Sequence, residues 1–246
     1  MPQQNKSLDS YYDQAFYDQQ VAGSLVSAKK YVAILSKVLS PKSVLDVGCG
    51  RGAWLKAFLE QGADRLVGID GPWNSQTNMI DDAIEFVQCD LENISALDER
   101  FDLSLSLEVG EHLSINASER LVSVLCTASD IVVFGAAIPG QGGTNHINEQ
   151  LQSFWANKFV ERGYSAFDLF RPKVWGDADV EVWYRQNTFL YVKKGAFLPK
   201  CEGLLEFCEI SSPAFMNLRH PGGTGIKEHF ADLRNAVRKR LAGPKQ

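Results

Sequence analysis

Two glutamates and a histidine lie close together in the stretch SLEVGEHLS, residues 106–114. If Glu108 begins a short helical turn, Glu111 and His112 follow at i+3 and i+4 and share its face. Two carboxylates at that spacing repel each other unless a proton or a cation lies between them. The stretch therefore predicts either a divalent metal site or a proton-transfer site in which His112 acts as the base.

A second histidine, His146, follows a predicted strand at 130–137 and precedes a predicted helix at 148–163. We expect it on the same rim of the sheet as the first stretch. Two glutamates and two histidines form a mixed nitrogen and oxygen donor set that suits magnesium, manganese, iron or zinc. Without a metal, His112 or His146 becomes the general base, and Glu111 is a further candidate for a role in catalysis.

Hydrophobic patterning predicts the elements that position these residues. Short apolar runs alternate with helical patterns, which indicates an α/β fold with a mostly parallel seven-stranded sheet and helices on both faces. The helices are expected at 52–62, 118–129 and 148–163. The strands are expected at 43–48, 65–70, 83–90, 101–108, 130–137, 164–170 and 188–194. Because a loop without a clear helix separates the last two strands, one of them is expected to run antiparallel.

Composition narrows the class of protein. The chain has 246 residues and a net charge of −5, which weighs against a broad nucleic-acid-binding surface. No apolar run approaches the ~18 residues that span a bilayer. The five cysteines are scattered, and the N-terminus lacks an apolar signal core. These features predict a cytoplasmic protein with reduced thiols and no membrane contact.

Acidic residues end the first three predicted strands. The run VLDVGCGRG, residues 44–52, places Asp46 ahead of alternating glycines, and such glycines let the backbone turn tightly beside a ligand. Asp70 ends the second strand, where a carboxylate can bind both hydroxyls of a ribose, and Asp90 ends the third. A nicotinamide dinucleotide site would need the third glycine one residue later.

Together these motifs resemble those of the class I S-adenosylmethionine-dependent methyltransferases, from about residue 43 to residue 194. The resemblance implies a Rossmann-like fold with S-adenosylmethionine as cofactor. It places the methionine part beside the glycine-rich turn, the ribose on Asp70, and the adenine near Asp90 and Leu91. The implied cofactor-binding residues are Asp46, Gly48, Cys49, Gly50, Asp70, Gly71, Asp90, Leu91 and Leu107.

The same resemblance suggests a division of the chain into three parts. Residues 1–41 form an N-terminal helical lid, residues 42–194 the cofactor-binding domain, and residues 195–246 a C-terminal extension. Aromatic residues near the N-terminus could cover the cofactor or pack the lid onto the domain. They are Tyr11, Tyr12, Phe16 and Tyr17.

The Glu-x-x-Glu-His pattern and the later histidine resemble the metal-dependent methyltransferases that modify the 3′-terminal 2′-hydroxyl of small RNAs. Ubiquinone-pathway O-methyltransferases show a similar Glu-x-x-Glu-His pattern. Either resemblance implies a metal that binds two neighbouring substrate oxygens and lowers the pKa of the attacking hydroxyl. The implied metal ligands are Glu108, Glu111, His112 and His146.

The acceptor is less constrained by sequence. The loop 171–187 could form a pocket for a sugar or could fill the space between the last two strands; its candidate residues are Arg171, Trp175, Trp183, Tyr184 and Arg185. A basic run at 233–241 is the main feature that would suit RNA. The sequence therefore favours O-methylation of a small oxygen-rich metabolite or sugar. RNA 3′-terminal 2′-O-methylation and non-catalytic cofactor binding are the alternatives.

Overall fold

The computed structural model describes residues 14–95, 97–196 and 208–220. The aromatic side chains at Tyr11, Tyr12, Phe16 and Tyr17 and the basic run 233–241 lie outside this description, as does most of the predicted C-terminal extension. No described helix is long and apolar enough to cross a bilayer.

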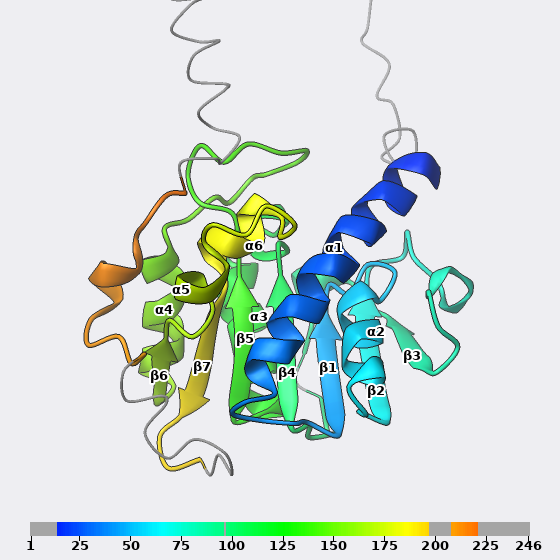
Figure 1. The fold of residues 1–246 in the computed structure, drawn as a ribbon, viewed down its shortest axis with the longest axis horizontal. Coiled ribbons are helices and arrows are strands. Elements are labelled where there is room, and N and C mark those ends of the chain that lie inside the picture. The colour runs from blue at the N-terminus through cyan, green and yellow to red at the C-terminus, as the bar shows by residue number, and fades with distance from the viewer. Residues whose placement is uncertain (1–13, 96, 197–207, 221–246) are drawn as a thin grey trace, which may run out of the picture.

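A seven-stranded sheet in the order β3-β2-β1-β4-β5-β7-β6 forms the centre of the fold (Figure 1). Among the described strands, β7 alone points opposite to the other strands, as expected for one of the last two strands. The strands are β1 (Ser43–Val47), β2 (Arg65–Asp70), β3 (Ile84–Gln88), β4 (Leu103–Leu107), β5 (Ile131–Gly135), β6 (Tyr164–Phe167) and β7 (Phe189–Lys193). The predicted α/β fold is confirmed.

Helices cover both faces of the sheet because successive strand residues point to opposite sides. Val44 of β1 packs in one apolar core with α1 (Gln14–Leu35) and α2 (Ala53–Glu60). The next residue, Leu45, packs in the other core with α3 (Ala117–Ala128) and α4 (Gln152–Glu161). Figure 1 shows α1 and α2 side by side across one face of the sheet.

The strand order reverses between β1 and β4. After β1 the chain continues to α2 on one face of the sheet, and after β4 it continues to α3 on the other face. Asp46 pairs in register with Leu105, so the carboxyl ends of both strands lie next to each other. In open parallel sheets this switch point is where ligands bind. Short 3-10 turns follow three of the parallel strands, namely η2 (Gln76–Asn78) after β2, η3 (Leu91–Asn93) after β3 and η4 (Gly110–His112) after β4.

The connection between β6 and β7 differs from the prediction of a loop without a helix. It contains two short helices, α5 (Arg171–Val174) and α6 (Val182–Asn187). Helices of four and six residues are too short to show a repeating apolar pattern, which explains why the sequence did not indicate them. The strand β6 also ends at Phe167, three residues earlier than expected.

The predicted helix at 148–163 begins later, at Gln152. The residues before it are held in a loop because the backbone N–H groups of Ile147 and Asn148 both donate to Glu111 O, at 2.9 and 3.0 Å. This pair of hydrogen bonds ties the segment that carries His146 to the turn that follows β4.

The described C-terminal segment, residues 208–220, runs beside the edge strand β6. Ile210 N donates to Ala166 O at 2.8 Å. The segment then forms a 3-10 turn, η5 (Pro213–Met216), beside α4. Arg219 then donates to the backbone oxygens of Pro139 and Gly140. The segment thus connects the outer edge of the sheet with the loop after β5.

Candidate functional site

A cavity of about 320 Å³ opens at the carboxyl ends of β1 and β4. One part of its wall is the glycine-rich turn after β1, and the other part comes from segments after β4 and β5. The lining includes Val21, Ser24, Asp46, Gly48, Cys49, Gly50, Arg51, Trp54, Leu107, Glu108, Glu111, His112, Gln141, His146, Trp183 and Tyr184.

The glycine-rich turn is held against β2 by its own backbone. Gly48 N and Cys49 N both donate to Ile69 O, at 2.7 and 3.1 Å. Gly48 has φ +82°, and a Cβ there would collide with the side chain of Val109. Gly50 has φ +53°, but a Cβ there would meet open space. Gly48 is therefore required by packing, whereas Gly50 leaves the backbone open to the cavity.

Asp46 and Asp70 sit on either side of this turn. The Asp46 side chain is buried and lines the cavity, and its burial, with the nearby charge of Asp70, raises its pKa well above the usual value. Asp70 does not line the cavity. Its carboxylate accepts from Gly50 N and Gly71 N, both at 2.7 Å. Burial raises the pKa of Asp70, and these backbone donors oppose the shift.

The other residues expected near the adenine lie away from the cavity lining. Gly71 packs against the ring of the exposed Trp73. Asp90 is exposed and caps η3, accepting from Glu92 N at 3.0 Å and Asn93 Nδ2 at 2.7 Å. Leu91 is buried in the core. By contrast, five of the predicted cofactor-binding residues do line the cavity: Asp46, Gly48, Cys49, Gly50 and Leu107.

The segment after β4 does not begin a helix at Glu108, contrary to the prediction. The turn η4 starts at Gly110, and Glu108 has φ +56°, a left-handed conformation that is unfavourable for a side-chain-bearing residue. Glu108 therefore does not form a helical i, i+3 pair with Glu111, although the two carboxyl groups remain close enough to interact. The Glu108 carboxylate instead accepts from Gln141 Nε2 at 2.7 Å and from Asn187 Nδ2 at 3.1 Å.

Glu111 is fully buried, and neither of its carboxylate oxygens makes a hydrogen bond within ordinary distance and angle limits. Burial is the main cause that raises its pKa well above the usual value, and the nearby Glu108 carboxylate adds to the shift. The backbone amides of Glu111 and Ala137 oppose it only in part. A buried carboxylate without a partner is costly, so this residue requires a proton or a cation beside it.

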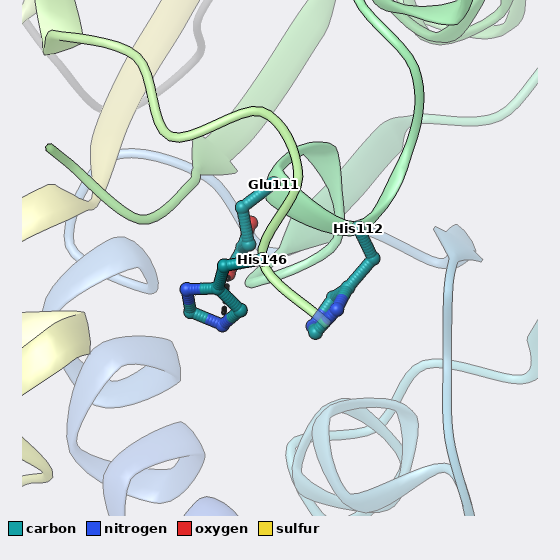
Figure 2. A group of neighbouring side chains, drawn as sticks. All are labelled: Glu111, His112 and His146. Carbon is teal, nitrogen blue, oxygen red and sulfur yellow. Dashed lines mark ion pairs between the residues drawn. The ribbon is translucent and has the colours of Figure 1, made fainter. Parts of the chain in front are cut away.

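The structure brings together three of the four predicted metal ligands. Figure 2 shows Glu111 and His112 from the turn after β4 facing His146 from the loop after β5. One ligand atom from each of the three residues lies within 4.8 Å of the others. His146 Nε2 is 4.0 Å from Glu111 Oε1, and the two imidazole rings pack edge to face with centroids 4.9 Å apart. Glu108 lies on the same cavity wall but outside this group.

The two histidines differ in their surroundings. His146 is largely covered, and its Nδ1 atom lies 2.9 Å from Glu149 Oε1. His112 lies at the exposed mouth of the cavity. The pKa of His112 is lowered, first by desolvation of its ring and then by the neighbouring His146. A neutral imidazole can accept a proton or bind a metal.

Several lining residues were not predicted from sequence. Trp54 lies in the first turn of α2, and Gln141 lies in the loop after β5. Glu149, which contacts His146 but does not line the cavity, was also missed, although its position three residues after His146 is a signal that could have found it. Of the five residues proposed in the loop 171–187, only Trp183 and Tyr184 line the cavity.

The helix α1 forms one side of the cavity, through Val21 and Ser24. Ser24 Oγ lies within hydrogen-bonding distance of Tyr184 OH, at 3.0 Å. Tyr31 OH, about two turns further along the same helix, donates to Tyr184 O at 2.8 Å. The N-terminal helix and α6 therefore close the cavity together.

Comparisons with known proteins agree with this architecture. Residues 44–128 match the family model described as a methyltransferase domain. This stretch contains the glycine-rich turn, Asp70, Asp90 and the Glu-x-x-Glu-His pattern. The match and the seven-stranded fold together make the chain similar to the class I S-adenosylmethionine-dependent methyltransferases. No curated protein sequence matches the chain.

Three solved structures show the extent of the likeness. The methyltransferase domain of bacterial CtHen1-C has a TM-score of 0.50 and 18% identity, over 70% of this chain and 98% of that one. The plantazolicin methyltransferase BpumL, solved with S-adenosylhomocysteine, has a TM-score of 0.53 and 18% identity, over 76% of this chain and 91% of that one. Magnesium protoporphyrin IX methyltransferase from Synechocystis PCC 6803, with bound S-adenosylmethionine, has a TM-score of 0.50 and 16% identity, over 74% of this chain and 86% of that one. At these identities the likeness concerns the fold.

Proposed function

We propose that this enzyme transfers the methyl group of S-adenosylmethionine to a hydroxyl of a small oxygen-rich acceptor, a sugar or a secondary metabolite, beside a divalent metal. The observation that carries the proposal is the fully buried Glu111 carboxylate, which has no hydrogen bond within ordinary distance and angle limits and faces two imidazoles in the same cavity as the glycine-rich turn. A cation at this point would compensate the buried charge.

The donor set fits a divalent metal. Glu111, His112 and His146 offer one oxygen and two nitrogens, a mixture that suits manganese, iron or zinc better than magnesium. Glu108 is a fourth candidate on the same wall, although its carboxylate oxygens already accept two amide hydrogen bonds. A bound divalent metal would supply Lewis-acid chemistry by lowering the pKa of an attacking hydroxyl.

The cofactor end of the cavity is the turn that contains Gly48 and Gly50. We place the methionine part of S-adenosylmethionine there, beside Cys49 and Leu107, because these residues line the cavity. Bound S-adenosylmethionine supplies an activated methyl group. Asp70 lies behind this turn, where its carboxylate accepts from Gly50 N, and we assign the ribose hydroxyls to it as the family resemblance implies.

The adenine would lie further along the edge of the sheet, past Gly71. We assign its amino group to Asp90 and one face of its ring to the side of Leu91, as the family resemblance implies. Asp90 is exposed and its carboxylate is oriented by Glu92 N and Asn93, so it is available at the surface.

The protein's own residues then orient the acceptor and receive its proton. Where no metal is bound, His112 at the cavity mouth and His146, whose Nε2 faces inward, are the candidates to accept the proton of the hydroxyl. A nitrogen that ligates the metal cannot accept this proton, because its lone pair is used. Trp54 and Tyr184 border the same space and exclude water from it. Val21 and Ser24 of α1 cover the cavity, which supports the N-terminal helix as a lid.

Charge favours a neutral acceptor over a nucleic acid. The cavity lining contains three carboxylates, at Asp46, Glu108 and Glu111, and one guanidinium, that of Arg51, whose Nε already donates to Asn78 O. Without the metal, a phosphate-rich acceptor would meet more carboxylates than cations at this wall. A 3′-terminal ribose of RNA remains the second candidate, because its two neighbouring hydroxyls would suit a metal bound by Glu111, His112 and His146.

Two further parts of the proposal concern the whole chain. We propose a cytoplasmic location, which the unpaired thiols of the described cysteines at 49, 89, 126 and 208 support. A non-catalytic role is the less favoured alternative, since a domain that only holds cofactor has no requirement for the three-residue cluster.

Isothermal titration tests the cofactor assignment. Asp70→Ala should bind S-adenosylmethionine at least about tenfold more weakly than wild type, since charged hydrogen-bond partners are worth about 1.5–3 kcal/mol. Asp64→Ala is the matched control, because Asp64 is an exposed aspartate just before the same strand. Equal binding by wild type and Asp70→Ala would remove Asp70 from the cofactor site.

Elemental analysis and an acceptor screen test the remainder. Protein purified without added metal should contain a divalent ion that His146→Ala lacks, and chelator should abolish methyl transfer. Cell extract divided into small-molecule and RNA fractions should give labelled product from radioactive cofactor in the small-molecule fraction. Activity that chelator leaves unchanged would refute the metal, and label confined to RNA would establish the second candidate.

A further inference from the structure

Three buried side-chain amides connect the C-terminal segment 208–220 with the cavity. Gln186 and Asn187 at the end of α6 are 3% and 2% exposed, and Gln141 from the loop after β5 is 8% exposed. All three touch one another, and two of them contact Glu108. Such a fully satisfied polar network is costly to disturb.

The direction of this network is fixed at one end by a backbone group. An amide side chain can usually be turned by 180° without visible change, but a backbone N–H can only donate. His220 N donates to Gln186 Oε1 at 2.7 Å. The carbonyl of Gln186 must therefore face the segment 208–220, and its NH₂ group must face the interior.

The remaining hydrogen bonds follow from that orientation. Gln186 Nε2 donates to Gln141 Oε1 at 3.2 Å and to Asn187 Oδ1 at 3.1 Å. Because both acceptors are carbonyl oxygens, the NH₂ groups of Gln141 and Asn187 turn the opposite way, toward Glu108. They donate to its two carboxylate oxygens at 2.7 and 3.1 Å, and Asn187 Nδ2 also donates to Gln141 Oε1 at 2.8 Å.

We propose that Gln186 is a positioning residue: through Asn187 and Gln141 it holds Glu108 as the acceptor of two amide hydrogen bonds and thereby sets the wall of the cavity beside Glu111. The inference rests on the proposed function for its effect on the reaction, because Glu108 is placed there on the acceptor side. The left-handed backbone of Glu108 explains the need for this support, since that conformation persists only where its surroundings impose it. The segment 208–220 is thus part of the site although none of its described residues lines the cavity.

A double-mutant cycle in thermal unfolding tests the direction of the network. Glu108→Gln places a side-chain NH₂ group against the NH₂ group of Gln141 or of Asn187. Asn187→Asp places a new carboxylate opposite the carboxylate of Glu108. Each single variant should lower Tm by about 5 °C. The double variant pairs the new donor with the new acceptor, so it should lose clearly less than the sum of the two. Additive losses would overturn the proposed direction.

A pair of glutamine variants tests the effect on the site. Gln186→Met removes the central amide, and Gln152→Met is the matched control. Gln152 is also buried and also donates to the C-terminal segment, to Leu218 O at 3.0 Å, but it has no contact with Glu108 through the network. Both variants should lose thermal stability. Only Gln186→Met should weaken Co²⁺ binding, by about tenfold, as measured by the visible absorption of the bound ion.

The outcomes separate this inference from the proposed function. Equal Co²⁺ affinity in Gln186→Met, Gln152→Met and wild type, with S-adenosylmethionine binding retained in all three, would overturn the positioning role. If the wild-type protein itself binds no Co²⁺, the metal is removed from the proposed function. The thermal cycle of Glu108 and Asn187 then decides the positioning inference alone, because it depends on neither metal nor activity.

Discussion

The Nδ1 atom of His146 lies 2.9 Å from Glu149 Oε1, and this contact turns Nε2 of the same ring toward Glu111, 4.0 Å away. The Glu149 carboxylate also accepts from Gly140 N at 2.7 Å and from Gly142 N at 3.0 Å. One side chain therefore fixes both the loop and the imidazole that it carries. A carboxylate behind a histidine places the proton on Nδ1 and leaves Nε2 free to bind a metal.

Glu149→Ala should release the ring of His146 and weaken metal binding. The expected loss of Co²⁺ affinity is about 10–100-fold, the range typical for partners behind a ligating histidine. Glu161→Ala is the control, since Glu161 is an exposed glutamate at the end of α4. Titration of the three proteins with Co²⁺ measures the effect, and equal affinities would show that Glu149 only braces the loop.

Glu111 predicts how stability depends on pH. Its folded-state pKa is raised by burial above the unfolded value of about 4.3, so the native state binds more protons than the unfolded state between these two values. Stability should therefore fall as pH rises from about 4 through the folded pKa. Thermal unfolding without metal should give a lower Tm at pH 8 than at pH 5, and Glu111→Gln should reduce the difference.

The pKa of Asp46 is also raised, so this residue changes stability with pH in the same direction as Glu111, and Asp46→Asn is needed as a parallel variant. Carboxylates whose pKa is lowered by surface partners, such as Asp81 beside Lys56, act with the opposite sign and below pH 4. Added Mn²⁺ should raise Tm more at pH 8 than at pH 5, because the ionised Glu111 is the form that binds it. A pH dependence that Glu111→Gln leaves intact would assign the effect to the other carboxyls whose pKa burial raises, namely Asp46, Asp70 and Glu108.

The sequence predicted the sheet because its strands are apolar runs of ordinary length between clear turn signals. The single antiparallel strand was also expected. The helices α5 and α6 were missed, since short helices with polar and aromatic residues have no visible period. Their packing depends on contacts with distant residues, such as the hydrogen bond of Arg171 with Met216 O, which no local pattern encodes.

The candidate site was predictable where chemistry and order along the chain coincide. Glu111, His112 and His146 were named from residue type and from their position after strands. The departure of Glu108 was not predictable, because its left-handed backbone and its partners Gln141 and Asn187 come from three separate segments. Amides that act as buried donors resemble ordinary polar residues until the fold brings them together.

Two glycines of the turn after β1 should respond differently to substitution. Gly48→Ala forces a Cβ against the rigid side chain of Val109 in addition to its unfavourable φ, so it should lower the free energy of unfolding by about 2–4 kcal/mol. Gly50→Ala meets open space and should cost about 1–2 kcal/mol. Its methyl group borders the cavity, so S-adenosylmethionine should bind more weakly. Chemical denaturation and titration calorimetry distinguish the two, and normal cofactor affinity in Gly50→Ala would move the methionine part away from this turn.

Gly110 allows the turn η4 to lie directly on Trp155, a fully buried residue of α4. A Cβ at position 110 would come within 2.7 Å of two atoms of the six-membered part of the Trp155 ring. Gly110→Ala should therefore displace the turn that carries Glu111 and His112, with a loss of both Tm and Co²⁺ affinity. The side chain is the cause of the clash, so a smaller ring at position 155 should relieve it.

Trp155→Phe provides that relief, since phenylalanine lacks the outer atoms of the indole ring. It also removes an indole N–H that is buried without a hydrogen-bond partner, which offsets part of the lost packing. The double variant Gly110→Ala/Trp155→Phe should bind Co²⁺ more tightly than Gly110→Ala alone. If both losses persist in the double variant, the clash with Trp155 is not their cause, and the core under the site does not set the position of Glu111.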